Sequence, residues 1–308
     1  SPLLAIALVP LFGNWQQASR GNQTDTTDFA RDLLNSVEPY GILVTVGDND
    51  TFPLWYAQEV EGIRKDVVVA NTSLLNTDWY RRQLIRRPVY EYDAANGPSI
   101  YRTGKWTKPT GSPIKMTFDE ADGMPLAIQT PPNSAFQANG IVATPRLPQL
   151  MAADQLVYFM IRDAFPARSL YFSRTAGGYP YELGLERYVI TQGMAKKLLD
   201  HEVMPGKDTV LVQGEGLVDI NRSKALWNDV FTATKSLTAR NGWVDDASVG
   251  IPDLYVISGV TLAEALASAG RMAESDSVFQ QARGIAKAMR REKVFGFDRQ
   301  QMPVGPGG

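Results

Sequence analysis

Two short apolar runs stand out in the first third of the chain. One spans Gly41–Gly47 (GILVTVG) and the other spans Asp66–Asn71 (DVVVAN). Both are rich in β-branched residues and have no polar face, which is typical of strands buried on both sides. We therefore expect these two segments to lie next to each other in the core of a sheet.

Helical spacing of apolar residues surrounds these runs. It indicates a helix from Thr27 or Asp28 to Ser36, a second from Phe52 to Val60 and a third from Asp78 to Arg86. The intervening residues 48–51 are predicted to form a turn, with Asp50 or Thr51 capping the second helix. Alternating strands and helices with short connections indicate right-handed crossovers and a parallel sheet. The predicted fold class is therefore α/β, with a parallel-sheet Rossmann-like core.

The middle of the chain is less regular. Residues 87–146 are rich in Pro, Gly and Asn and predict irregular insertions with short strands such as Pro113–Phe118. Helical spacing returns over Leu147–Phe165. The runs Arg168–Ser173 and Asp208–Gln213 then predict two more strands, the first of them in the same sheet.

The last regular section indicates a pair of short amphipathic helices around Gly270. Small residues with one aromatic at this spacing are typical of a tetratricopeptide-type helix pair, and a single pair must pack on another surface to bury its apolar face. The predicted organisation is an apolar segment at 1–14, an α/β domain at 15–250, a helical hairpin at 251–295 and a disordered tail at 296–308.

Composition narrows the functional classes. The chain has 308 residues, a formal net charge of −2 and no cysteine. This charge gives no field that favours nucleic acid, so we expect no nucleic-acid partner. The lack of cysteine excludes disulfides, thiolate nucleophiles and cysteine-ligated metal.

The amino-terminal segment Pro2–Phe12 is uncharged and almost wholly apolar. It is too short to cross a bilayer as a complete helix. A signal-peptide core is one interpretation, but no basic region precedes it. Two others remain open: it is the end of a membrane helix, or it is an apolar segment that packs on the domain or on a second copy of the chain.

The string GDNDTFPLW at 47–55 carries the main candidate chemistry. Ligands bind at the carboxyl ends of parallel strands, where Asp48 and Asp50 are expected to lie. Two carboxylates at this spacing can share a hard cation or hold a sugar hydroxyl, as in the Asp-x-Asp element of nucleotide-sugar glycosyltransferases. The structural alternative is that Asp50 caps the helix and Asp48 orders the turn.

Aromatic and amide side chains extend this candidate site, because Tyr and Trp offer a flat apolar face with a polar edge to sugars and peptides. Equally, aromatics at helical spacing can belong to the core. His201 lies outside any nucleophile motif, and there is no phosphate-binding or dinucleotide loop, so no cofactor, no metal and no catalytic residue is assigned. The predicted binding residues are Asp48, Asn49, Asp50, Trp55, Asn76, Trp79, Tyr179 and Tyr181.

Residues 47–84, with the strings GDNDTFPLW and SLLNTDWY, strongly resemble a family of bacterial multi-pass membrane proteins described as protein O-mannosyltransferase-like, found in Bacteroidetes and relatives. The resemblance extends over most of residues 15–290. It implies that this chain is similar to the extracytoplasmic carboxyl-terminal region of such proteins, membrane-anchored through the amino-terminal segment. The catalytic acid of these transferases usually lies in the membrane domain, so the resemblance implies a glycosyltransferase parent without catalysis by this region alone.

Three functions compete at this point. The first is an accessory domain of a glycosyltransferase that uses a lipid-linked sugar, with an acceptor protein or glycan as its partner. The second is a structural protein that forms homo-oligomers through its apolar amino terminus and helix pair. The third is a self-contained enzyme that uses Asp48 and Asp50 with a metal.

Overall fold

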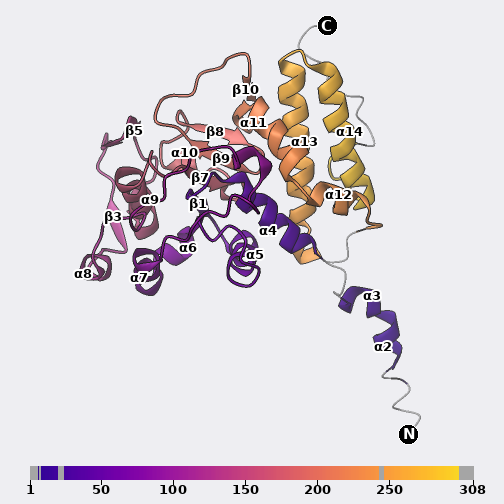
Figure 1. Ribbon diagram of the computed structural model, residues 1–308, viewed down its shortest axis with the longest axis horizontal. Helices are drawn as coiled ribbons and strands as arrows, with labels where there is room; N and C mark the ends of the chain where they lie inside the picture. The colour runs from indigo at the N-terminus through magenta and orange to yellow at the C-terminus, as the bar shows by residue number, and fades with distance from the viewer. Residues whose placement is uncertain (1–5, 7, 20–23, 243–245, 298–308) are drawn as a thin grey trace.

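The computed structural model describes residues 6, 8–19, 24–242 and 246–297. Most of the predicted disordered tail, and part of the apolar segment at 1–14, lie outside these residues. Within the described part, α2 (Leu8–Gly13) and α3 (Trp15–Ala18) project away from the body of the molecule (Figure 1).

A seven-stranded sheet forms the centre of the fold. Its spatial order is β10 (Thr209–Val212), β11 (Gly216–Asp219), β8 (Val189–Gln192), β9 (Ala195–Leu198), β7 (Leu170–Ser173), β1 (Ile42–Thr45) and β2 (Val68–Asn71). The strand β1 is parallel to both β2 and β7, with Ile42 opposite Val68 and Leu170. The two apolar runs predicted to be neighbours are therefore paired, and the strand predicted at Arg168–Ser173 joins them.

The other half of the sheet is not uniformly parallel. The strand β9 runs antiparallel to both β7 and β8, and β10 is antiparallel to β11. Tight turns make this possible, since β8 and β9 are joined through Gly193 at φ 59° and β10 and β11 through Gly214 at φ 81°. The fold is therefore mixed α/β, with three mutually parallel strands at one side of the sheet.

Alternate residues of the parallel strands face two different cores. In β1, Leu43 belongs to one core, and Ile42 and Val44 belong to the other, as the two-residue period of a strand requires. The first core is shared with α4 (Asp25–Ser36) and α5 (Asp48–Glu59). The second is shared with α6 (Thr72–Leu75), α7 (Asp78–Arg86) and α9 (Ala152–Asp163).

The carboxyl-terminal helices pack on the first core. The helices α13 (Gly250–Ser268) and α14 (Met272–Ala288) lie side by side (Figure 1) and are joined through Gly270 at φ 75°. Both are longer than the short helices predicted. By length and composition, α13 is the one helix in the described ranges that could cross a membrane, but 67% of that stretch is buried inside the molecule. The apolar composition of α13 is therefore also typical of a helix in a protein core.

The remaining elements form insertions and edges. Two small hairpin-like sheets, β3 with β6 and β4 with β5, and the helix α8 occupy the irregular middle region. The bounds of these middle elements are α8 (Phe118–Asp122), β3 (Ala127–Gln129), β4 (Phe136–Ala138), β5 (Ile141–Ala143) and β6 (Gln149–Met151). Three further helices follow later in the chain: α10 (Tyr179–Glu182), α11 (Ile220–Ala225) and α12 (Ala233–Thr238).

Several local predictions were wrong. The segment Pro113–Phe118 forms no strand; instead Thr117 caps α8 in a capping box with Glu120. The predicted helix over Leu147–Phe165 is shorter at both ends, because residues 149–151 pair with β3. The helix predicted from Thr27 or Asp28 begins earlier, at Asp25.

The correction that matters most concerns residues 48–51. They are not a turn before a helix but the first turn of α5, which begins at Asp48. Gly47 makes the change of direction with φ 91°, a conformation that favours glycine. Carboxylates are favourable in the first turn of a helix because they face its positive end, so Asp48 and Asp50 fit there without acting as caps.

Candidate binding pocket at the carboxyl ends of the parallel strands

The three parallel strands each end in a buried polar residue. These residues are Thr45 of β1, Asn71 of β2 and Ser173 of β7, none of them more than 1% exposed. Because the carboxyl ends of parallel strands meet at one edge of a sheet, the three side chains lie close together. They link the strands to the first turn of α5.

Thr51 joins two of these strand ends. Its Oγ1 lies 2.7 Å from Thr45 Oγ1 and accepts a hydrogen bond of 2.8 Å from Asn71 Nδ2. Asn71 Nδ2 also donates to the Gly47 carbonyl at 2.9 Å, and Asn71 Oδ1 accepts from the Leu74 backbone N–H at 2.9 Å. The bonds to Thr51 and Gly47 fix the start of α5 against the sheet, and the bond from Leu74 caps α6.

Asp50 joins the third strand end. The residue is 1% exposed, and Ser173 Oγ donates to its Oδ2 at 2.9 Å. Thr175 Oγ1 donates to the same oxygen, and Thr51 Oγ1 donates to Oδ1 at 3.3 Å. Burial raises the pKa of Asp50, and these hydroxyl hydrogen bonds offset only part of that rise. The described chain gives this carboxylate hydroxyl partners but no ion pair.

Asp48 and Asn49 are exposed beside it, in the same turn. Pro53 lies four residues after Asn49 and has no N–H, so it cannot donate the hydrogen bond that a helix normally supplies to the Asn49 carbonyl. The first turn of α5 therefore exposes a carboxylate and an amide side chain, and its Asn49 carbonyl lacks the usual helical donor.

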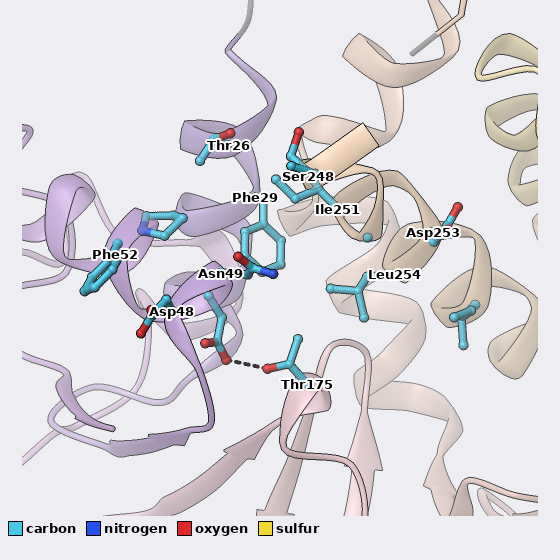
Figure 2. A pocket seen from close by; sticks show the side chains of 15 residues that line it. Thr26, Phe29, Asp48, Asn49, Phe52, Thr175, Ser248, Ile251, Asp253 and Leu254 are labelled. Carbon is cyan, nitrogen blue, oxygen red and sulfur yellow. Dashed lines mark hydrogen bonds between the residues drawn. The ribbon is translucent and has the colours of Figure 1, made fainter. Parts of the chain in front are cut away.

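A pocket of about 490 Å³ opens at this turn. Figure 2 shows α4 and α5 on one side and the start of α13 on the other, with Ile251 and Leu254 projecting toward Phe29. Asp50 and Thr175 both line the pocket, and the dashed line that ends at Thr175 in the figure marks their hydrogen bond. The described lining residues are Thr26, Phe29, Asp48, Asn49, Asp50, Phe52, Pro53, Thr175, Ala247, Ser248, Gly250, Ile251, Asp253, Leu254 and Ile257.

The structure thus brings Asp48, Asn49 and Asp50 to a cavity, as expected from their position after a buried strand. A volume of several hundred Å³ with apolar walls and a few polar groups is typical of small-ligand and side-chain binding sites.

The predicted aromatic residues lie elsewhere. Trp55 packs between the two cores, with its ring centroid 5.9 Å from that of Tyr80. Trp79 is 54% exposed and stacks edge-on against Tyr80 at 5.5 Å. The ring centroid of Phe52 lies 5.8 Å from that of Trp55. Of these neighbouring aromatic residues, Phe52 is the one that lines the pocket.

Asn76, Tyr179 and Tyr181 have structural partners. Asn76 Oδ1 accepts from the Ala153 backbone N–H at 3.0 Å and so holds the start of α9. The Tyr179 hydroxyl donates to Asp154 Oδ1 at 2.7 Å. The Tyr181 hydroxyl accepts from Lys196 Nζ at 3.0 Å. None of the three is among the described residues that line the pocket.

Sequence reasoning did not identify Thr175 or the wall formed by Ile251 and Leu254. These residues are separated from Asp50 by more than a hundred positions, and no local pattern connects them. The strand ends Asn71 and Ser173 did carry a signal, since each is the first polar residue after an apolar run.

The placement of metal-ligating side-chain types and of the histidine bears on the chemistry of this site. Within the described ranges, no group of three or more His, Asp or Glu side chains is placed to hold a metal ion. His201 lies at the surface, with its side chain 69% exposed and Nδ1 2.7 Å from Asp200 Oδ1. The only histidine is therefore not part of the pocket.

Comparison with known protein families gives one match. Residues 26–130 match the model described as TMEM260-associated domain 2, which includes α4, α5 and the first two parallel strands. No match is found among curated proteins or among solved structures. The match links this part of the chain to TMEM260, in agreement with the glycosyltransferase-type resemblance of the sequence.

Proposed function

We propose that this chain is the extracytoplasmic accessory domain of a membrane-bound glycosyltransferase that uses a lipid-linked sugar, and that it binds the acceptor protein or glycan. The family match over residues 26–130 supports a link to such an enzyme. In this proposal catalysis belongs to another part of the parent protein, and the domain holds the acceptor near it.

The observation that carries the proposal is the pocket at the carboxyl ends of β1, β2 and β7. It combines apolar walls from α4 and α13 with polar groups from the first turn of α5. Open α/β sheets bind ligands at this edge. The part of the domain matched by the family model supplies one whole side of the pocket.

Two finer features belong to the same proposal. The β1–α5–β2 crossover together with β7 supports a Rossmann-like core within the mixed sheet, although β9 and β10 depart from that arrangement. The α13–α14 pair around Gly270 is proposed to be tetratricopeptide-like.

The amino terminus is proposed to attach the domain to the membrane on its extracytoplasmic side. Leu8, Val9, Leu11 and Phe12 of α2 are between 47% and 74% exposed. A helix that is apolar on all sides is stable only in a membrane or inside a protein, so these side chains need a cover that the body of the molecule does not supply.

A second function explains the same exposed segment. It would be buried between copies of the chain, making this a structural protein that forms homo-oligomers. Deleting residues 1–13 and measuring the mass in detergent-free solution separates the two. Oligomers that lose subunits on deletion support assembly, whereas an unchanged mass together with lost binding to lipid vesicles supports attachment.

The acceptor-binding proposal is tested by filling the pocket. Gly250 lines it, and a Cβ added there would meet nothing within 4 Å, so Gly250→Phe is a substitution without a clash at Cβ that adds bulk at the pocket. We expect the variant to bind acceptor proteins or glycans at least about tenfold more weakly, a loss of about 1.4 kcal/mol. Calorimetric titration of the full chain measures it.

The matched control is Gly206→Phe. Gly206 is also exposed and also has open space around its Cβ, but it lies before β10 and outside the described lining of the pocket. Equal binding by both variants and the unaltered chain would contradict the proposal.

A further inference from the structure

The described lining of the pocket carries acidic charge without basic charge. It contains Asp48, Asp50 and Asp253, and within the described ranges it contains no lysine, arginine or histidine. Asp253 is neutralised by Arg291, whose Nε and Nη2 donate to its two oxygens at 2.6 Å each. The uncompensated charge therefore lies at the end formed by Asp48 and Asp50.

Carboxylates predominate among the polar side chains at that end. The described residues offer Asp48 no ion pair, and the carboxylate of Asp50 receives hydrogen bonds from hydroxyl groups and from its own backbone N–H, with no cation. The Asn49 carbonyl lacks the helical donor that Pro53 cannot supply. The first turn of α5 therefore presents an excess of acceptors, and the complementary ligand group is a cation with several N–H donors.

The opposite side of the pocket is apolar. Phe29, Ile251 and Leu254 face one another there (Figure 2). An aliphatic or aromatic side chain fits this region, because its burial also covers Phe52 and Ile257, which are 53% and 36% exposed, whereas Phe29 and Ile251 are already buried. The apolar wall and the acidic turn line the same pocket of about 490 Å³. Two neighbouring groups of one ligand can therefore contact the wall and the turn at the same time.

We propose that the pocket binds a peptide segment in which an apolar side chain packs on Leu254 beside the buried Phe29 and an adjacent arginine or lysine pairs with the exposed Asp48, next to the buried charge of Asp50. This inference rests on the proposed function and specifies the acceptor as a protein with a basic–apolar motif. A free saccharide leaves the apolar walls unfilled, and a phosphate-bearing lipid brings negative charge next to two carboxylates.

One feature of the site favours the opposite charge. The free N–H groups at the start of α5 give this helix end a partial positive charge of about half an elementary charge. Two carboxylates in the same turn outweigh it, so we expect attraction for cations. Binding of an anion is accordingly an outcome that the experiment has to include.

The experiment uses the full chain and three capped synthetic peptides that differ at one position. Each has a central leucine in a Gly/Ser background, followed by arginine, glutamine or glutamate. We expect the arginine peptide to bind roughly tenfold more tightly than the glutamate peptide, with glutamine between them and the preference shrinking as salt rises. Fluorescence anisotropy measures the Kd values, and inorganic phosphate is added as a competitor.

Charge reversal at Asp48 provides the sharpest variant, because its side chain is exposed and the fold does not depend on it. Asp48→Lys is expected to remove the preference for the arginine peptide and to favour the glutamate peptide. The control is Asp119→Lys, since Asp119 is also an exposed carboxylate in a first helical turn, that of α8, outside the described pocket lining.

The outcomes separate the two proposals. Equal binding of all three peptides, sensitive to Gly250→Phe, overturns the basic–apolar specificity and leaves acceptor binding in place. Competition by phosphate, or tighter binding of the glutamate peptide to the unaltered chain, also overturns the specificity. Arginine-dependent binding that natural acceptor proteins fail to reproduce contradicts the proposed function instead.

Discussion

Buried carboxylates at the two ends of the three parallel strands have different partners. At the amino end, Arg64 pairs with Asp66 through Nε–Oδ1 at 2.9 Å and Nη2–Oδ2 at 3.0 Å, and Lys197 pairs with Glu38. At the carboxyl end, Asp50 is 1% exposed and receives hydrogen bonds from hydroxyl groups and from its own backbone N–H, without a cation. The charge of a buried carboxylate that pairs with its own cation is already neutralised. A buried carboxylate without a cation can still be stabilised by a positively charged ligand.

The pKa values of these carboxyl groups differ in the same way between the two ends of the strands. Burial acts to raise the pKa of Glu38, but the charge and hydrogen bond of Lys197 outweigh it, and the pKa lies below its ordinary value. The pKa of Asp50 is raised, because burial is opposed only by hydrogen bonds from hydroxyl groups and from its own backbone N–H, without a cation. Perturbed carboxylates in a cavity are more often functional than those in closed ion pairs. The comparison therefore supports a structural role for the ion pairs at the amino end and the proposed binding role for the carboxyl end.

The largest expected effect is at the amino end. Asp66→Asn leaves the buried Arg64 guanidinium without a counter-charge and weakens the acceptor of the Tyr40 backbone N–H. We expect the free energy of unfolding to fall by about 3–5 kcal/mol, measured by urea denaturation. As a control, Glu59→Gln removes a half-exposed carboxylate near Lys65 and should cost less than about 1 kcal/mol. Similar losses for both would show that the buried pair is not special.

Asp32 is a third buried carboxylate with which the two strand ends can be compared. It is fully buried without a cation but lies away from the pocket. It accepts hydrogen bonds from the Thr232 and Ala233 backbone N–H groups and from the Tyr255 hydroxyl. Burial raises its pKa from 3.8 to about 6 despite these bonds. Folding therefore favours the protonated form, and the stability from this group is greatest below about pH 4 and is lost as the pH rises through about 6.

We expect the unaltered chain to lose about 2–3 kcal/mol between pH 4 and pH 7 relative to Asp32→Asn, which cannot titrate there. Urea midpoints of both proteins across this range give the difference, and taking the difference removes the contribution of other carboxylates. Parallel stability curves would mean that the N–H groups of α12 keep Asp32 ionised throughout.

A smaller effect on stability is expected at Asp50. Asp50→Asn removes a desolvated charge but also weakens the acceptor of Ser173 and Thr175, so we expect the free energy of unfolding to change by no more than about 1 kcal/mol. The same substitution at Asp66 is the internal reference. A loss at Asp50 as large as that at Asp66 would identify Asp50 as a structural group and weaken the case for a binding role.

The smallest effect on stability is expected for Asp48→Asn. The exposed side chain interacts mainly with the positive end of α5, so the cost is about 0.5 kcal/mol or less. Peptide binding, by contrast, should weaken severalfold. A thermal melt and the anisotropy titration on the same samples compare the two, and a stability loss without a binding loss would contradict the assignment.

The sequence by itself determined the three parallel strands of the sheet and one side of the site, although it misplaced several shorter elements. Continuous β-branched runs at Gly41–Gly47 and Asp66–Asn71 predicted buried neighbouring strands, and β1 and β2 are paired as expected. Because a buried strand must be followed by a turn at the sheet edge, the position of Asp48–Asn49–Asp50 at that edge could also be predicted. The helix Asp78–Arg86 was predicted with its observed bounds.

Only the tertiary structure decided what faces that edge. Hydrogen bonds from Ser173 and Thr175 to Asp50 join residues more than a hundred positions apart, and the opposing wall comes from α13. It also decided that Tyr179 and Tyr181 bond to Asp154 and Lys196 rather than line the pocket. Periodicity reports which face of an element is buried, but the partner of that face depends on how distant segments pack, and no local pattern encodes that choice.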